Sequence, residues 1–95
     1  MSGAPKKLGE GETLLTFPTL FPIKAMGKRE AGFAQAVLDI VLAHAPDFDA
    51  ATLEMRPSKN GNFLSVTATI NATSKAQLDD IYRALTAHPA VLMAL

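Results

Sequence analysis

An Asn60-Gly61 dipeptide between two alternating stretches constrains the fold of this chain more than any other feature. Asn-Gly is the strongest short signal for a two-residue type I′ turn, because both central residues of that turn need a positive φ. The flanking stretches, residues 51–57 and 62–72, alternate apolar and polar side chains as half-buried strands do. The sequence therefore predicts a β-hairpin that turns at Asn60 and Gly61.

This turn also fixes the pairing of the two predicted strands. Apolar residues then oppose one another in the pairs Pro57–Leu64, Met55–Val66 and Leu53–Ala68. Polar residues oppose one another on the other side, in the pairs Arg56–Ser65, Glu54–Thr67 and Thr52–Thr69. Because a slip of one residue would move every side chain to the opposite face, this register is strongly specified. The hairpin predicts a sheet with one apolar and one polar face.

A strand and a helix are predicted before the hairpin. Residues 13–22 contain two Phe-Pro pairs, which favour an extended segment whose rings cover a core edge. The strand spans residues 21–26 and ends at Gly27. The helix follows at about residues 28–45, where apolar residues recur at helical spacing, and Pro46 stops it.

A second helix and a last strand are predicted after the hairpin. Ser74 and Gln77 form a capping-box pattern, which marks the start of a helix that runs to about Ala87. Pro89 closes this helix, and residues 90–95 form the last strand. The element order is therefore strand, helix, strand, strand, helix, strand.

This order predicts an α+β, ferredoxin-like βαββαβ sandwich. Its four-stranded antiparallel sheet has the order 4-1-3-2, with two helices on one face. The first strand of the hairpin then lies at an edge, where Pro57 is tolerated. We expect these strand residues to point at the helices: Ile23, Leu53, Met55, Leu64, Val66, Ala68, Ile70, Val91 and Met93.

Composition restricts the class of protein. The 95 residues are 48% hydrophobic and 19% charged, as in an ordered globule, and the formal net charge is zero. A neutral chain argues against a main role in coating nucleic acid or anionic membrane. The absence of Cys excludes a disulfide scaffold and a thiolate site. With no signal peptide and no transmembrane stretch, we expect a cytoplasmic protein.

The first residues differ in composition from the rest. Residues 1–12 are small, polar and Gly-rich, which predicts a disordered N-terminal tail. Residues 13–95 are predicted to form a single domain, a length that can bury a core without metal or disulfides.

Several segments resemble one small bacterial family. They are residues 17–27 (FPTLFPIKAMG), 58–67 (SKNGNFLSVT), 44–46 (HAP) and 70–73 (INAT). Together they resemble the YbeD-like proteins, a family of unknown biochemical function, over residues 13–95. The resemblance implies a ferredoxin-like fold similar to ACT regulatory domains, which bind amino acids or other small effectors. It carries over no functional residues.

The first candidate site is the predicted strand-to-helix turn. Lys24, Lys28 and Arg29 cluster there, Gly27 leaves room for close approach, and a helix N-terminus favours anions. By resemblance, the equivalent turn of ACT-like domains often holds the effector. The alternative is a solvated helix end whose cations extend into water.

Two further surfaces are candidate interfaces. Leu38 and Leu42 lie one turn apart, opposite the predicted core stripe, and suggest a partner helix or a homodimer seam, although isolated exposed leucines are also normal. The polar sheet face, with Arg56, Phe63 and by our expectation Leu92, suits either solvent or a wet protein interface.

The sequence thus favours an uncharacterised, non-enzymatic regulatory or adaptor module. Its partner would be a small anionic metabolite at the first strand-to-helix turn, a protein, or both. The alternative is a purely protein-binding adaptor that uses the sheet face or the edge strand. No catalytic residue, metal site or cofactor is predicted, since no nucleophile–base or ligand pattern is present. RNA binding is disfavoured because Phe63 alone could stack bases.

Overall fold

The computed structural model describes residues 15–95, which form one sheet and two covering helices. The predicted tail, residues 1–12, lies outside the described residues. The strands are β1 (Thr19–Lys28), β2 (Glu54–Pro57), β3 (Phe63–Ala72) and β4 (Met93–Ala94), and the helices are α1 (Phe33–His44) and α2 (Lys75–Ala87). A short 3₁₀ helix, η2 (Ala50–Thr52), precedes β2.

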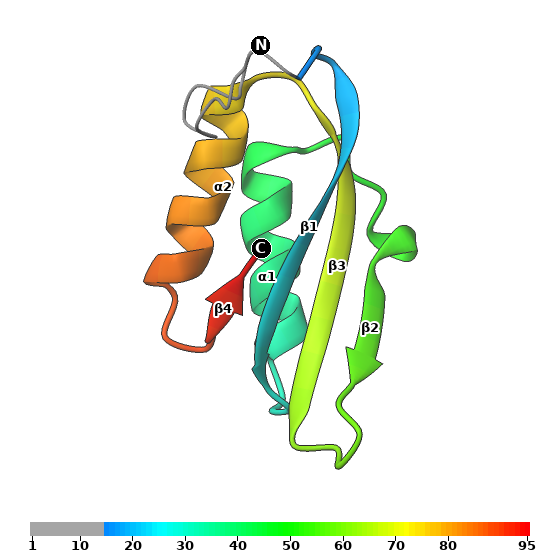
Figure 1. Ribbon diagram of the computed structural model, residues 1–95, viewed down its shortest axis with the longest axis vertical. Helices are drawn as coiled ribbons and strands as arrows, with labels where there is room; N and C mark the ends of the chain where they lie inside the picture. The colour runs from blue at the N-terminus through cyan, green and yellow to red at the C-terminus, as the bar shows by residue number, and fades with distance from the viewer. Residues whose placement is uncertain (1–14) are drawn as a thin grey trace, which may run out of the picture.

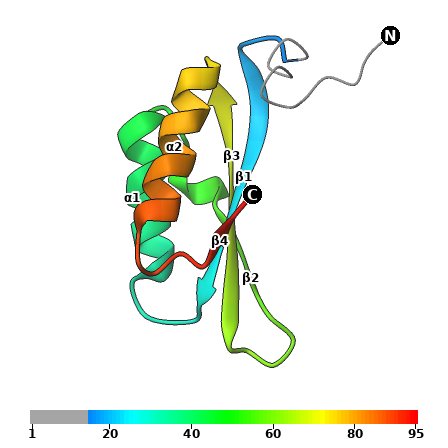
Figure 2. The same cartoon turned by 60° about the vertical axis from the view of Figure 1, so that its left-hand side comes forward.

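The sheet has the order β2-β3-β1-β4, and every neighbouring pair is antiparallel. Read from the other end, this is the predicted order 4-1-3-2. Figure 1 shows β1 and β3 as long strands that run side by side, with β2 and β4 flanking them. Figure 2 shows both helices on one side of the sheet. The ferredoxin-like βαββαβ sandwich is therefore confirmed.

The core lies between the helices and the face of the sheet that they cover. Since side chains alternate across a strand, every second residue of β1 and β3 points at the helices. The strands contribute Ile23, Ala25, Val66, Ala68, Ile70 and Ala72, and the helices contribute Phe33, Val37, Val41, Leu78, Ile81 and Leu85. All of these side chains are buried, so the opposite face of the sheet is free of any covering layer in residues 15–95.

The hairpin register is confirmed, but the predicted turn type is wrong. Pairing runs from Glu54 opposite Thr67 to Pro57 opposite Leu64. Gly61 has a φ of 80°, yet no other residue type in 15–95 has a positive φ, so Asn60 cannot complete a type I′ turn.

Side chains stabilise the turn instead. The Gly61 amide donates to the carbonyl of Ser58 at 2.9 Å, and the Ser58 hydroxyl donates to Asn60 Oδ1 at 3.0 Å. The same oxygen of Asn60 accepts from the Asn62 amide at 3.2 Å.

Several element boundaries differ from the prediction. β1 is longer than residues 21–26, because it stays paired with β3 from Thr19 to Lys28. β2 is shorter than residues 51–57, because residues 50–52 form η2, in which the Asp49 side chain accepts from the Ala51 amide. α1 begins at Phe33 and not at Lys28, since Gly32 takes a left-handed φ of 91° at the N-cap.

The second helix matches its prediction. Ser74 is the N-cap of α2, and its hydroxyl accepts from the Gln77 amide at 3.1 Å. The Gln77 side chain returns to the backbone, accepting from the Thr73 amide at 2.7 Å. The first bond satisfies an amide that the first turn of a helix leaves without a partner, and the second fixes the chain just before the N-cap.

Two methionines that were expected in the core are exposed. Met55 lies opposite buried Val66, but it belongs to the edge strand β2 and its side chain is 56% exposed. Met93 lies opposite Met26, and opposite residues of an antiparallel pair share a face, so it points away from the helices. Ala94 takes the helix-facing position, opposite Ala25. Leu92, which was expected on the polar face, precedes β4 and is 58% exposed, while its neighbour Val91 packs against the core as expected.

Two prolines lie at edges of the sheet that no other strand of residues 15–95 covers. Lys24 and Leu95 exchange backbone hydrogen bonds, so the amides of even-numbered residues in β1 point toward β4. Pro22 follows the same alternation beyond the end of β4, where its missing N–H costs no bond to that strand. The Ser58 amide donates toward β3, to the carbonyl of Phe63. The ring nitrogen of Pro57 therefore faces outward from β2.

Candidate functional site

The uncovered face of the sheet carries polar residues on β1, β2 and β3, and apolar ones that extend from Phe63 of β3 across Met26 of β1 to β4. Alternation places every second residue of β1 and β3 there, together with residues of both edge strands. The β1 and β3 residues include Lys24, Met26, Lys28, Phe63, Ser65 and Thr67, and the edge strands add Glu54, Arg56, Met93 and Leu95. We refer to this surface as the uncovered face.

A shallow hollow of about 410 Å³ lies over β3 on the uncovered face. Its walls include Lys24 from β1 and Glu54 and Arg56 from β2, and Ser65 and Thr67 provide its floor. The register of the strands explains this shape. Across the sheet, Thr67 of β3 lies between Lys24 of β1 and Glu54 of β2, and two residues along β3, Ser65 lies opposite Arg56 of β2. Two short side chains therefore separate three long charged ones.

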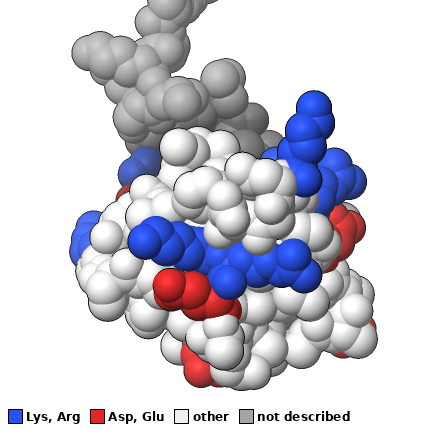
Figure 3. Space-filling model, turned by 90° about the horizontal axis from the view of Figure 1, so that it is seen from below, with Lys and Arg blue, Asp and Glu red and all other residues white. Residues whose placement is uncertain are grey.

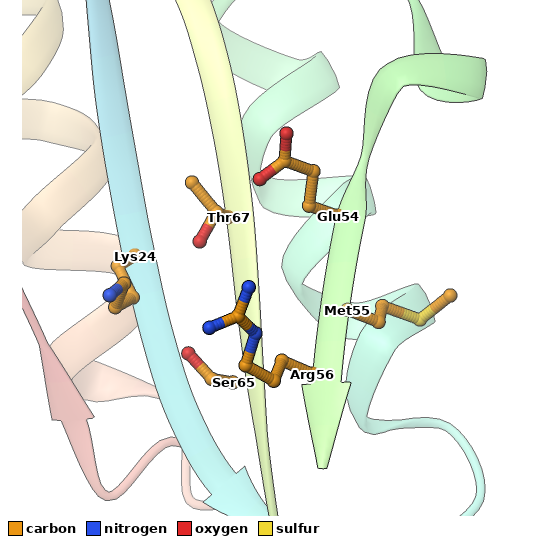
Figure 4. Close-up of a pocket in the computed structure, with 6 residues that line it drawn as sticks. All are labelled: Lys24, Glu54, Met55, Arg56, Ser65 and Thr67. Atoms are coloured by element: carbon orange, nitrogen blue, oxygen red, sulfur yellow. The ribbon is translucent and has the colours of Figure 1, made fainter.

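Figure 4 shows how these side chains lie. Arg56 extends from β2 across β3 toward Ser65 and Thr67, and Glu54 also leans toward β3. Lys24 stands on β1 at the opposite side of the hollow, and the Met55 side chain points away from it. The hollow thus has cations on two sides and one carboxylate beside Arg56.

The polar groups of the hollow have no partners within residues 15–95. Lys24, Glu54 and Arg56 form no ion pair there, whereas α2 carries the pairs Lys75–Asp79 at 2.7 Å and Arg83–Asp80 at 3.0 Å. The hydroxyls of Ser65 and Thr67 are half-buried and form no hydrogen bond with the described part of the chain. A ligand could therefore bind these groups without first displacing an internal contact.

An apolar strip adjoins the hollow. A second depression of about 260 Å³ is lined by Met26, Pro57, Phe63 and Leu64, and it shares Arg56 and Ser65 with the hollow. On the other side of Met26 lie Met93, 50% exposed, and Leu95, 64% exposed. We call Met26, Phe63, Met93 and Leu95 the apolar strip.

The structure does not gather the four predicted anion-binding residues into one site. Lys24 and Lys28 share the uncovered face but stand about 13 Å apart along β1, at a rise of about 3.3 Å per residue. Gly27 is buried on the opposite face, where an added Cβ would overlap the Ala90 carbonyl and lie 2.6 Å from Cε1 of Phe33. Gly27 therefore makes room for the core and not for a ligand.

Arg29 packs against the hairpin turn. Its amide donates to the carbonyl of Asn62 at 2.9 Å, and its guanidinium lies 3.4 Å from the position of a Cβ on Gly61. Because α1 begins at Phe33, neither Lys28 nor Arg29 lies in its first turn, and that part of the expectation is wrong. Anion binding by these residues stays a prediction.

One end of the molecule holds the hairpin turn and the turn between β1 and α1. It carries a band of basic side chains with acidic ones beside it (Figure 3). A depression of about 360 Å³ there is lined by Lys28, Arg29, Glu30, Asn62 and Phe63. Glu30 supplies a carboxylate next to the two cations, which reduces the attraction of this depression for an anion.

Leu38 and Leu42 were expected to be exposed, and the structure shows that they are not. Both are half-buried and pack against the core, while Gln35, Asp39 and Ala43 form the exposed side of α1. The reason is that α1 packs both on the sheet and beside α2, so its apolar stripe is wider than a sheet contact alone requires. A homodimer seam at Leu38 and Leu42 loses its basis.

Both histidines and the tyrosine have structural partners. His44 Nδ1 lies 3.0 Å from the carbonyl of Ile40, and His88 Nδ1 accepts from the Ala90 amide at 3.1 Å. The Tyr82 hydroxyl donates to the carbonyl oxygen of Leu95 at 2.6 Å, and partial burial raises the pKa of Tyr82 above its ordinary value. Neither histidine lines the hollow.

Residues 15–95 contain neither a candidate metal site nor a candidate membrane-spanning helix. No group of His, Asp and Glu there is arranged to hold a metal ion. Over the same residues, neither helix has the length and apolar content that crossing a bilayer requires.

The fold and the site define a class: a small ferredoxin-like α+β sandwich with a polar hollow and an apolar strip on an uncovered antiparallel sheet. The chain belongs to the family described as "Protein of unknown function (DUF493)", which it matches over residues 12–95. This finding confirms the resemblance to the YbeD-like proteins.

Bacterial relatives cover most of the chain. It is 57% identical over 84 residues to the UPF0250 protein NE1487 of Nitrosomonas europaea, spanning 88% of this chain and 97% of that protein. It is 52% identical over 84 residues to a UPF0250 protein of Bordetella pertussis, spanning 88% of this chain and 92% of that protein. Neither name assigns an activity.

A solved structure supports the fold. The solution structure of protein HP0495 from H. pylori aligns with a TM-score of 0.70 and 16% identity, and covers 85% of each chain. At this identity the likeness shows the fold alone.

Proposed function

We propose that this chain is a non-enzymatic adaptor that binds a protein partner through the uncovered face. The observation that carries the proposal is the apolar strip, whose Met93 and Leu95 are at least half exposed on a face that no element of residues 15–95 covers. Interfaces of this kind combine apolar and aromatic contacts with a polar rim, and Met, Phe and Arg are among the residue types that they favour. Arg56 and Lys24 stand at the rim of this strip.

The non-enzymatic part of the proposal is supported by the position of the histidines. General acid–base catalysis most often uses His, and here both rings contact backbone groups away from the hollow. The chain has no Cys to serve as a nucleophile. Ser65 and Thr67 have hydroxyls in the hollow, but no histidine lines it to take their protons.

Strand addition at the edge of β2 is the weaker form of the adaptor proposal. The strand has four residues, and its outward amides alternate with those that bond β3. Pro57 removes one outward donor, which leaves the Met55 amide as the outward donor of β2. A partner strand would gain few main-chain bonds there.

Site-specific photo-crosslinking in the host cell tests the proposal. A photoreactive residue is placed at Phe63 on the uncovered face and, as a matched control, at Gln35 on the exposed side of α1. The expected result is a defined heavier adduct from position 63 and none from position 35. A Met93→Ser change in the same strip should weaken the adduct from position 63.

Two outcomes would contradict the adaptor proposal. One is equal crosslinking from both positions, which would indicate random encounters. The other is the absence of any adduct from position 63 in cells that express the protein at its normal level. An adduct of twice the chain mass would identify a second copy as the partner.

A further inference from the structure

The hollow has a chemical character that protein docking on the apolar strip does not explain. Two cations and one carboxylate line it, which leaves one excess positive charge. The hydroxyls of Ser65 and Thr67 lie between them and are half-buried, without a hydrogen-bond partner in residues 15–95. Half-buried polar groups normally bond to protein or water, so these hydroxyls are available to a polar ligand.

The spacing of the charges suits a small ligand. Lys24 and Glu54 lie on strands either side of β3, so their Cα atoms are about 10 Å apart at two strand spacings. They form no ion pair across this distance. Arg56 reaches over β3 toward the floor of the hollow (Figure 4). The hollow of about 410 Å³ between these three side chains is large enough for a molecule of a few carbon atoms.

We propose that the hollow binds a small 2-hydroxy carboxylate. Its carboxylate accepts hydrogen bonds from Arg56 and Lys24, and Arg is suited to bind both oxygens of a carboxylate. Its hydroxyl donates to the Glu54 carboxylate and accepts from Thr67. Arg56 and Lys24 also stand at the rim of the apolar strip, so the ligand and a protein partner would share them, but neither role requires the other.

The charges of the hollow favour a 2-hydroxy carboxylate over an amino acid, a phosphate or a simple carboxylate. A ligand of charge −1 matches the excess positive charge of the hollow, whereas an α-amino acid is a zwitterion without net charge and leaves that excess uncompensated. A phosphate dianion would be repelled by Glu54. A simple carboxylate without a hydroxyl would leave Glu54 desolvated and without a donor, which costs binding free energy.

Titration of the isotope-labelled full chain, followed by NMR, tests the proposal. The probe is L-lactate, and propionate is its matched control because it lacks only the hydroxyl. We expect saturable shifts of the backbone amides of Lys24, Arg56, Ser65 and Thr67, with lactate binding about tenfold more tightly than propionate. L-Alanine and inorganic phosphate should bind more weakly than lactate.

Three variants assign the interactions. Arg56→Gln and Lys24→Gln should each weaken lactate binding, Arg56→Gln by about tenfold. Lys59→Gln removes an exposed cation of the hairpin turn that does not line the hollow, and it should leave the affinity unchanged. Glu54→Gln should reduce the preference for lactate over propionate, because the amide accepts a hydrogen bond less strongly than a carboxylate.

The proposal fails if lactate causes no saturable shift, or if Arg56→Gln and Lys59→Gln weaken binding equally. Equal affinity for lactate and propionate in the unmodified protein would also overturn it. Since Lys24 and Arg56 are exposed, their variants should keep the thermal stability of the parent, which a melting curve checks. The titration needs no partner, so its result is separate from that of the crosslinking experiment.

Discussion

The two faces of the sheet are built from the same strands and differ in almost every physical respect. On the covered face, Ile23, Val66 and Ile70 are buried to within about 1% of full burial. On the uncovered face, their neighbours Lys24, Ser65 and Thr67 line a hollow and have no partners within residues 15–95. The buried contacts that stabilise the fold therefore lie on the covered face, and the side chains that line the hollow add none of them.

Replacing adjacent residues of β1 should give the largest difference between the faces. Ile23→Ala removes a fully buried side chain beneath the helices and should lower the free energy of unfolding by about 3 kcal/mol. Lys24→Ala, one residue further along, should change it by less than about 0.5 kcal/mol. Urea denaturation of both variants measures the contrast, and similar losses would contradict it.

A smaller effect is expected from adding one methyl group to the covered face. Gly27→Ala places a Cβ against the Ala90 carbonyl and 2.6 Å from the ring of Phe33, so the core must shift. We expect a loss of about 2 kcal/mol, typical of overpacking. Lys28→Ala on the uncovered face is the control and should be nearly neutral. A neutral Gly27→Ala variant would show that the covering layer yields easily.

The same substitution on the two sides of the sheet gives a third test. Ser74→Ala removes the hydroxyl that accepts from the Gln77 amide at the start of α2, and it should cost about 1 kcal/mol. Ser65→Ala removes a hydroxyl with no partner in residues 15–95 and should cost less than about 0.5 kcal/mol. Thermal melts of both variants compare the two losses of stability. A larger loss for Ser65→Ala than for Ser74→Ala would mean that the Ser65 hydroxyl stabilises the fold.

The smallest expected effect concerns a contact at the border of the two layers. Burial raises the pKa of Tyr82, so folding favours its neutral phenol, which donates to the carbonyl oxygen of Leu95. This contribution is complete below the pKa of unfolded tyrosine, about 10, and is lost as the pH rises through the higher folded value. Stability of the parent should therefore fall more steeply above about pH 10 than that of Tyr82→Phe.

Unfolding free energies measured at several pH values above neutrality would show this difference in slope. Other tyrosine titrations do not complicate the comparison, because the chain contains one Tyr. Parallel curves for the parent and Tyr82→Phe would mean that the phenol is as exposed in the folded state as in the unfolded one.

Local patterns in the sequence predicted much of this architecture. The alternation around Asn60 and Gly61 gave the hairpin register, and the Ser74–Gln77 pattern gave the start of α2. Both are short-range signals, in which the side chains that decide the structure are neighbours in sequence. The order of the strands followed from the element order and the handedness of crossovers.

Apart from the turn type at Asn60 and Gly61, which local hydrogen bonds decide, the errors arose where contacts between distant residues decide the structure. Met55 follows the correct alternation, but alternation does not say how far two helices reach over an edge strand. Residues 91–95 are uniformly apolar, so no pattern within them could show that Met93 and Leu95 point away from the core. The predicted start of α1 at Lys28 was too early because Lys28 still pairs with Phe63 of β3. This pairing joins residues that are distant in sequence, so the segment around Gly32 gives no sign of it.

The candidate site was only partly predictable. The hairpin pattern placed Arg56, Glu54, Ser65 and Thr67 on one polar face, and that placement is confirmed. Their grouping around a hollow depends on β1 lying beside β3, which brings Lys24 opposite Thr67. The sequence pointed to the turn at Gly27 instead, because a cluster of cations beside a glycine is visible without knowledge of the fold.

The positions of Pro22 and Pro57 have a consequence for how copies of the chain behave in a crowded solution. A sheet edge with free amides can recruit the backbone of another copy, and repeated recruitment produces fibres. Here Pro57 in β2 and Pro22, beyond the end of β4, each place a ring nitrogen where another residue would offer an outward amide, so a second copy that paired at either position would lack one bond. The two prolines therefore weaken strand pairing between copies at both margins of a sheet that has one face uncovered by any element of residues 15–95.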